Sequence, residues 1–297
     1  MSKQQLYKSM QPNNCITIIS TVTLTLMMIA PLTSQDQKPK SQPKVEKLSK
    51  WPALKTTESE RARATARQFK KPQEKLHAAA TKRLIAIGPA VAPIIIPMVS
   101  DRPESINDNL FEVLDAVLNT KHAALLARET KRPSVEWRRY LTRKLATFHD
   151  KELTPVFKQA IKDKDADIAT YGAIALLSLG NHDGLEIAML AAKQRWAEFR
   201  DIAAEVLAAG RSEKVATPIF AKIAAARPTD QMAGLRLLRY LIVKDQSMLL
   251  KRYLESSDFT VKKEAINTAR VLFGEKPLDK LSSFQAIDQA KVWLNKL

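Results

Sequence analysis

Apolar side chains recur at helical spacing along most of this chain. The stretch from residue 165 to residue 193 predicts two helices, because two apolar stripes with a period near 3.6 are separated by a glycine-containing break at 180–184. The stripes consist of Ile168, Tyr171, Ala175 and Leu179 in the first helix and Leu185, Ala188, Met189 and Ala192 in the second. Neither helix buries its stripe alone, so such a pair is stable only when similar pairs stack beside it.

The same pattern recurs every 28 to 34 residues. The last strong apolar residue of each first helix, which we call its anchor, stands in turn at Leu84, Val117, Leu145, Leu177, Leu207, Leu241 and Leu272. A glycine follows four of these anchors within two to four residues, at Gly88, Gly180, Gly210 and Gly274. Glycine ends a helix readily because it adopts positive φ without steric cost. The spacing therefore predicts seven two-helix units, from about residue 74 to the C-terminus.

One junction between two predicted helices resembles a known family. It reads Leu84-Ile-Ala-Ile-Gly-Pro-Ala-Val-Ala-Pro-Ile-Ile-Ile-Pro-Met98, in which Gly88 ends one helix and Pro89 begins the next. This passage resembles the helix-turn-helix junction of HEAT repeats, the armadillo-like family. The resemblance implies an all-α fold, a right-handed α-solenoid of about seven HEAT-like repeats in which the second helices line the concave surface.

Composition and the ends of the repeat region agree with a helical chain. Only 7 of the 297 residues are glycine, and alanine, the best helix former, is abundant. The repeat region is expected to span 57–297, with a polar helix over 59–70 covering its first unit. At the other end, Ser282 and Gln285 have capping-box spacing and predict a final helix. Its buried face is expected to carry Phe284, Ile287, Ala290 and Leu294.

The first 56 residues read differently from the rest. Residues 1–34 carry two lysines and then an uncharged run over 15–30, the order of an export signal, with retention as an N-terminal membrane anchor as the alternative. Removal of the signal would take away Cys15, the single cysteine. Residues 35–56 contain prolines, glutamines and lysines and are expected to form a disordered basic linker. We therefore expect a periplasmic or secreted protein.

The net charge of +17 is concentrated near the N-terminus. Between residues 35 and 83 there are fourteen lysines and arginines against five acids. Such a linker would be attracted to a membrane or another anionic polymer, or would act only as a soluble tether. Nucleic acid is an unlikely partner because the surplus is modest in the repeats and an exported chain does not meet chromosomal DNA.

No motif of an enzyme or a metal site is complete. Asp163, Asp165 and Asp167 match the start of a calcium loop, but isoleucine occupies both the sixth and the twelfth positions, so we expect Asp165 to cap a helix instead. The four histidines lack the spacing of a helical zinc site. Neither a P-loop nor a G-x-S-x-G nucleophile motif is present. We expect no catalytic activity, no cofactor and no metal.

Two stretches interleave aromatic residues with cations, as binders of single-stranded nucleic acid do. One contains Trp137 and Arg138, and the other contains Trp196 and Arg200. The alternative is that Trp137 and Phe199, each eight residues before an anchor, fill equivalent gaps in the core.

The predicted second helices carry roughly one lysine per unit. These residues are Lys158, Lys193, Lys222 and Lys251. Together they would form a ladder that receives an acidic protein partner, or else an ordinary solvated stripe.

These observations favour a non-catalytic protein-binding scaffold of the cell envelope or secreted space. The candidate partner-binding residues are Lys158, Lys193, Lys222, Lys251, Trp137 and Arg138. Two alternatives stay open. Some HEAT-like proteins resemble bilin lyases, and a bound pigment would favour such an enzyme; the other alternative is a binder of nucleic acid or anionic polymer that acts through basic residues.

Overall fold

The computed structural model of the chain describes residues 46–102 and 106–297. Within these ranges the chain forms fifteen α-helices joined by turns and short 3-10 helices, and it contains no strand. The all-α prediction is confirmed for this part of the protein. The predicted export signal at 1–34, with Cys15, lies outside the described residues, as does the first half of the predicted linker, 35–45.

The helices alternate between two roles along the chain, after an opening helix α1 (Thr56–Ala66). Those that carry the anchors are α2 (Glu74–Ile87), α4 (Asn107–Val117), α6 (Val135–Ala146), α8 (Ala166–Ser178), α10 (Trp196–Ala209), α12 (Pro228–Leu241) and α14 (Phe259–Leu272). We call these the first helices. The second helices are α3 (Ala92–Ile95), α5 (Ala123–Arg128), α7 (Thr154–Ala160), α9 (Leu185–Gln194), α11 (Glu213–Ile223), α13 (Lys251–Leu254) and α15 (Ser283–Lys296). Adjacent 3-10 turns lengthen α3, α5, α7 and α13.

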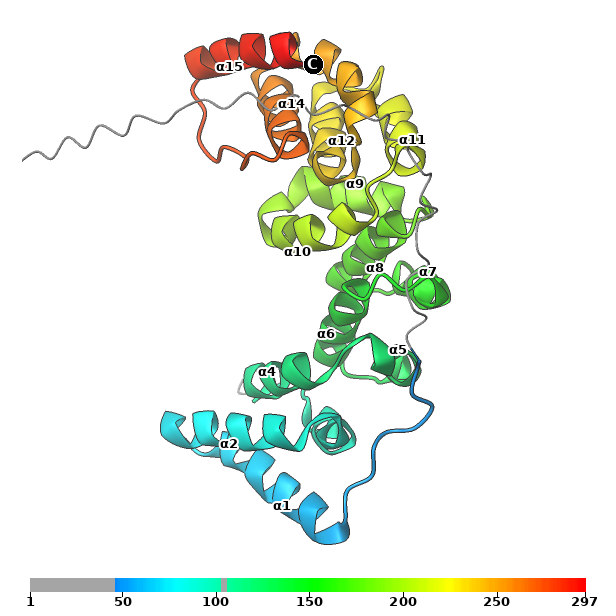
Figure 1. The fold of residues 1–297 in the computed structure, drawn as a ribbon, viewed down its shortest axis with the longest axis vertical. Coiled ribbons are helices and arrows are strands. Elements are labelled where there is room, and N and C mark those ends of the chain that lie inside the picture. The colour runs from blue at the N-terminus through cyan, green and yellow to red at the C-terminus, as the bar shows by residue number, and fades with distance from the viewer. Residues whose placement is uncertain (1–45, 103–105) are drawn as a thin grey trace, which may run out of the picture. The chain divides into compact units, whose positions relative to one another are not determined.

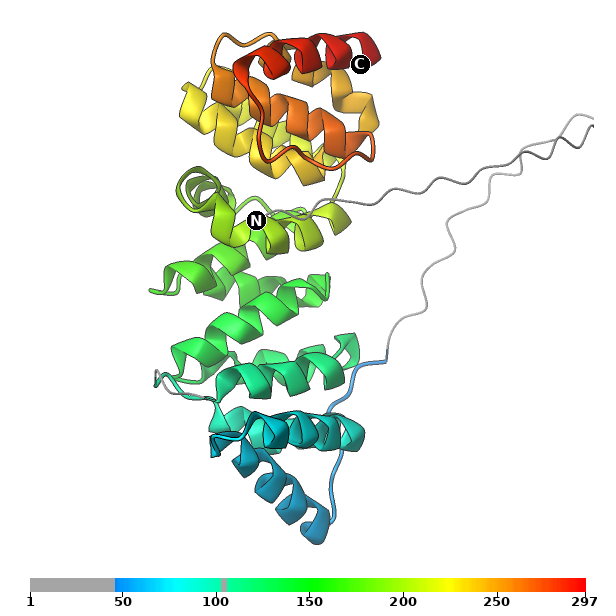
Figure 2. The same ribbon diagram turned by 90° about the vertical axis from the view of Figure 1, so that its left-hand side faces the viewer.

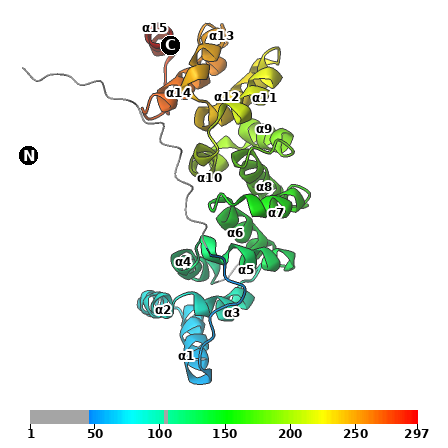
Figure 3. The ribbon, with the colours of Figure 1, turned by 45° about the vertical axis from the view of Figure 1, so that its right-hand side comes forward.

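Every predicted anchor lies in the last turns of a first helix and is buried. Successive first helices pack on one another, as α6 does on α8, α8 on α10, α10 on α12 and α12 on α14. The buried side chains form one hydrophobic cluster, which extends from Ala62 in α1 to Trp293 in α15. Figure 1 shows the helices following one another in chain order, and Figures 2 and 3 show the same order from two other sides.

The glycines that end the first helices do so in two ways. Gly88, Gly180 and Gly274 have φ of 80°, 78° and 84°. A positive φ of this kind is common where a helix ends, and glycine adopts it without steric cost. Gly210 does not, because its φ is −89°. A Cβ added there would lie 2.3 Å from the carbonyl oxygen of Ser178. The prediction of a glycine at this helix end is therefore right, but the reason is close packing against the end of α8.

The three aspartates of the 163–167 segment are held by arginines. The side chain of Asp165 accepts hydrogen bonds from the backbone N–H groups of residues 167 and 168, so it caps α8 as expected. Its carboxylate also lies 2.6 Å from Arg139, and hydrogen bonding to that guanidinium lowers the pKa of Asp165. Asp163 pairs with Arg138 at 3.0 Å, and Asp167 pairs with Arg195 at 2.7 Å. These pairs join the N-terminal ends of α6, α8 and α10.

The final helix begins as predicted but turns a different face to the core. The Ser282 hydroxyl accepts a hydrogen bond from the backbone N–H of Gln285, and the side-chain oxygen of Gln285 accepts one from the backbone N–H of Ser282, so the capping box is present. The buried residues of α15 are Ala286, Ala290 and Trp293. The expected face is therefore wrong at two positions, because Phe284 is 83% exposed and Ile287 is also exposed. Trp293 offers the larger apolar area, and its burial turns these two residues outward.

The end of the predicted linker is packed against the helices. We call residues 46–55 the strap; it is the blue segment that leads to α1 in Figure 1. Lys47 lies 2.5 Å from Asp150 and 2.6 Å from Glu152, and the backbone N–H of Leu48 donates to the carbonyl of Lys121. Trp51 stacks on His122 with ring centroids 5.7 Å apart. The expectation of a disordered linker is thus wrong for these residues, because contacts with distant side chains hold them.

Candidate functional site

The four predicted lysines lie on second helices, as expected, but three of them already have acidic partners. Lys158 on α7 lies 2.8 Å from Asp183, and Lys193 on α9 lies 2.7 Å from Asp230. Lys222 on α11 pairs with Glu186 on α9. The Lys158 and Lys222 pairs each join one two-helix unit to the next, whereas the Lys193 pair reaches from α9 to α12, past the unit in between. Lys251 on α13 is exposed, and the described part of the chain offers it no ion pair.

These ion pairs change what the lysines offer to a partner. Hydrogen bonding to Lys158 and to Lys193 lowers the pKa values of Asp183 and Asp230 respectively, so both acids are charged at neutral pH. Exposed pairs of this kind contribute little to stability and are screened by salt. The surface around these lysines therefore carries charges of both signs rather than a uniform ladder of cations.

Trp137 is not available to a partner in this structure. It is 0% exposed, and its indole Nε1–H donates to the carbonyl of Glu129 at 3.0 Å. Its place in the partner-binding set is corrected, and the alternative that Trp137 and Phe199 fill the core is confirmed, since Phe199 is buried as well. The reason is that α6 directs its apolar stripe inward and carries Trp137 with it.

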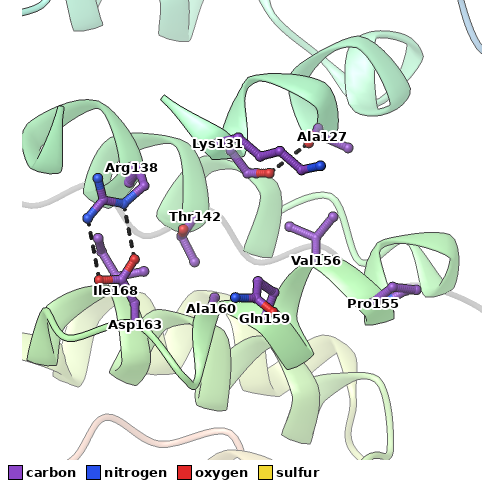
Figure 4. Close-up of a pocket in the computed structure, with 11 residues that line it drawn as sticks. Ala127, Lys131, Arg138, Thr142, Pro155, Val156, Gln159, Ala160, Asp163 and Ile168 are labelled. Carbon is purple, nitrogen blue, oxygen red and sulfur yellow. Dashed lines mark hydrogen bonds and ion pairs between the residues drawn. The ribbon is translucent and has the colours of Figure 1, made fainter. Parts of the chain in front are cut away.

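Arg138 is half-buried and lines a groove between α5 and α7. The groove has a volume of about 450 Å³ and is bordered by both helices together with parts of α6 and α8. Figure 4 shows Arg138 joined to Asp163 across the groove from Lys131. The remaining lining is mostly small and apolar and comes from Ala127, Pro155, Val156, Ala160 and Ile168, with Thr130, Thr142 and Gln159 as polar groups.

A second groove of about 450 Å³ lies two units further along, between α9 and α11. Its apolar lining comes from Met189, Leu190, Ile223 and Ala226, and both lysine pairs of this region border it. Leu190 is 53% exposed although it lies in the middle of α9. The groove thus combines an accessible apolar side chain with the Lys193–Asp230 and Lys222–Glu186 pairs.

The apolar pattern did not mark Leu190 as a candidate binding residue, although the sequence contains a signal for it. The buried stripe of α9 contains Leu185, Ala188, Met189 and Ala192, and Leu190 falls outside that register. A leucine outside the buried register of a helix is available to a partner. The acidic residues that pair with the lysines had no comparable signal, because Asp230 lies 37 positions beyond Lys193.

Compared with models of known protein families, the chain matches none, and no curated protein matches it either. The site therefore has to be interpreted from its own geometry.

The first helices also border cavities. One of about 270 Å³ is lined by Asp115 of α4, Tyr140 and Arg143 of α6, and Glu205 of α10. Burial raises the pKa of the Tyr140 hydroxyl, which donates to Asp115 at 3.1 Å. Because residues of three units meet here, non-neighbouring units come together on the side of the first helices.

The described residues contain no cluster of three histidine, cysteine, aspartate or glutamate side chains that could hold a metal ion. Three histidines are used locally: His122 stacks on Trp51, His182 contacts the carbonyl of Val215, and His77 contacts that of Lys71. Among the described helices none is long and apolar enough to cross a membrane singly, whereas the sharply bent pair Glu74–Ile87 and Pro89–Met98 meets that criterion by length and composition.

Proposed function

We propose that this protein is a non-catalytic protein-binding scaffold of the cell envelope or secreted space. In this proposal the seven helix pairs form an α-solenoid of HEAT-like repeats. The order of the pairs supports it, as do the buried anchors and the packing of successive first helices from α6 to α14 on one another. The assignment to an exported compartment is based on the composition of residues 1–34.

The groove between α9 and α11 is the observation that carries the proposal. Apolar pockets bordered by a few polar groups are typical of binding sites, and this one has an accessible leucine beside two exchangeable ion pairs. A partner segment that covers Leu190 would remove apolar surface from water. A carboxylate or an ammonium of that segment would replace one member of an ion pair without leaving a buried charge alone.

The α5–α7 groove supports a binding surface that extends beyond one site. It has a similar volume and likewise lies between consecutive second helices, with Arg138 and Asp163 in place of a lysine pair. Two grooves on the same class of helices would bind an extended segment, or two segments, of one partner. Linked contacts of this kind add affinity without any single strong contact.

A site-specific crosslinking experiment tests this proposal. A photoreactive residue is placed at position 190 of the full-length chain in its native cell, with position 291 on α15 as the control, because Lys291 is also exposed but faces another surface. We expect a defined protein crosslink from position 190 and none from position 291. Equal crosslinking from both positions, or none from position 190, would contradict the proposal.

Once the crosslinked partner is identified, Leu190→Ala measures what the groove contributes. We expect partner affinity to fall on the order of tenfold, because full burial of a leucine side chain contributes about 1.5–3 kcal/mol and alanine loses most of that apolar area. The thermal midpoint should stay close to that of the original chain, since Leu190 is already largely exposed. Leu249→Ala, at an exposed leucine outside the groove, is the matched control.

A further inference from the structure

A separate cavity lies on the side of the first helices. It has a volume of about 400 Å³ and is bordered by α10, α12, α14 and the segment 276–279, which connects α14 to α15. That segment is fixed in place by α14: Asn267 exchanges two hydrogen bonds with the backbone of Leu278, at 3.1 and 2.7 Å. Lys263 also donates to the carbonyl of Asp279 at 2.8 Å. The cavity wall is therefore already formed in the free protein.

Two arginines on α12 share one acid at this cavity. Both Arg236 and Arg239 bind the carboxylate of Glu264, which is itself buried. Arg239 is only 5% exposed, and its Nε has no hydrogen-bond partner. Two guanidinium groups thus face a single carboxylate in a buried setting. An arginine needs acceptors for all of its N–H groups when it leaves water, so this site is short of negative charge.

Aromatic rings stand beside these guanidinium groups. The carbon atoms at the centres of Arg236 and Arg239 lie 5.9 and 5.7 Å from the ring of Trp196. Tyr240 also lines the cavity, with its ring 6.5 Å from that of Trp196. The rings hold the cations through their π faces and add no negative charge, so they do not supply the missing acceptor.

Further cations border the opening. Arg200, Lys263 and Lys276 line the cavity, and so do Asp201 and Asp279. Both aspartates are almost fully exposed, and Arg200 lies 3.5 Å from each. Across the whole cavity five cationic side chains face three acidic ones. The surplus is two positive charges.

We propose that this cavity binds a small dianion, either a phosphate group or a pair of carboxylates carried on one molecule. A guanidinium group binds both kinds of oxyanion through paired N–H donors. A dianion balances the surplus charge, and the volume lies within the range of small-molecule pockets. This site is independent of the α9–α11 groove, so its failure would leave the scaffold proposal untouched.

Calorimetric titration of the full-length chain tests the inference. The probes are inorganic phosphate, succinate and acetate at constant ionic strength, which together separate the phosphate form, the dicarboxylate form and a singly charged control. We expect saturable binding of one molecule of phosphate or of succinate and no saturation by acetate. The absence of saturation by either dianion in the millimolar range would overturn the inference.

Two variants connect binding to this cavity. Arg200→Gln with Lys276→Gln removes two exposed cations, while Glu264 stays paired with Arg236 and Arg239, so the variant should keep its fold. We expect it to bind the dianion at least tenfold more weakly. Arg239→Lys keeps the positive charge but loses the paired N–H donors of the guanidinium group, and we expect this variant to bind the dianion more weakly too. Lys82→Gln with Lys214→Gln changes the same number of charges at exposed positions outside the cavity and should bind as the original chain does. Equal weakening in this control would show a general charge effect and overturn the inference.

Discussion

Single residues at the ends of the helices meet two different physical requirements. Gly274 has a positive φ but open space around it, since no atom lies within 4 Å of an added Cβ. Gly210 has an ordinary φ but almost no space, because the backbone of Ser178 touches it. The first glycine is needed for its backbone conformation, and the second is needed because it has no side chain.

Alanine substitutions separate these requirements. We expect Gly274→Ala to lower the free energy of unfolding by about 1 kcal/mol, the cost of a left-handed conformation for an L-residue. Gly210→Ala should lower it by about 3 kcal/mol, because a methyl group there must displace backbone from α8. Urea unfolding of both variants measures the difference. Similar losses in the two variants would contradict the close-packing explanation for Gly210.

His122 couples the strap to pH. Its ring is buried beneath Trp51, and its Nδ1 accepts from the backbone N–H of Asn119 at 3.2 Å. Burial lowers the pKa of His122, and the nearby Lys121 acts in the same direction. Below about pH 6.5 the His122 ring therefore binds a proton more readily in the unfolded chain than in the folded chain. The stability from the neutral ring is present above that pH and is lost as the pH falls.

We expect the free energy of unfolding to decrease between about pH 7.5 and about pH 5, and to decrease less in His122→Phe. Burial also lowers the pKa of His149, so a smaller slope should persist in the variant. Aspartates such as Asp165 do not contribute in this window, because their pKa values lie below the ordinary 3.8. Unfolding curves at several pH values provide the measurement. An unchanged slope in the variant would show that His122 is not the titrating group.

At the scale of elements, contacts between residues far apart in the sequence hold the strap in place. The strap has no regular secondary structure, yet Lys47 reaches acids more than a hundred residues away. Burial lowers the pKa of Lys47, but hydrogen bonds to Asp150 and Glu152 outweigh this effect and raise it. The strap thus connects the start of α1 to the turn between α6 and α7, within the third unit.

Trp51→Ala should release the strap, because it removes the ring that stacks on His122. We expect trypsin to cleave after Lys47 and Lys50 several times faster in this variant, with little change in helical content. Timed digestion followed by mass spectrometry of the fragments measures the rates. Leu249→Ala serves as the control. If the cleavage rates of Trp51→Ala and the control agree, the stacking contact does not hold the strap.

At the scale of the whole molecule, most helices make their main contacts with helices one or two places away along the chain, although α9 packs most extensively on α12. The most extensive contact joins α12 to α14, and none of the main contacts skips from one end of the described region to the other. Stability in such an arrangement is close to a sum of local terms. Loss of a terminal unit then weakens its neighbour without unfolding the rest.

A truncated chain tests this expectation. Ending the protein at residue 255 removes α14 and α15, and we expect the remaining helices to persist with a lower thermal midpoint, because α12 then exposes the face that α14 covers. Circular dichroism during heating provides the measurement. A chain that ends at residue 280 and lacks only α15 should have a thermal midpoint between those of the full-length chain and the shorter chain. Loss of all helical signal in the shorter chain would contradict the expectation.

The local pattern of the sequence was sufficient to predict the helices, their anchors and several of their caps. Helical periodicity and cap chemistry act over a few residues, which is why Leu177, Asp165 and Ser282 could be placed from the sequence. The lysines of the candidate site were likewise placed on second helices, as in the case of Lys193. Leu190 could have been found by its departure from the buried register of α9.

Only the tertiary structure decided which surfaces remain open. The pairing of Lys193 with Asp230, the burial of Trp137 and the face that α15 turns inward all depend on side chains from other helices. The order of the strap depends on acids of a distant unit. These properties arise from contacts between residues far apart in the chain, and a pattern that repeats every few residues contains no information about them.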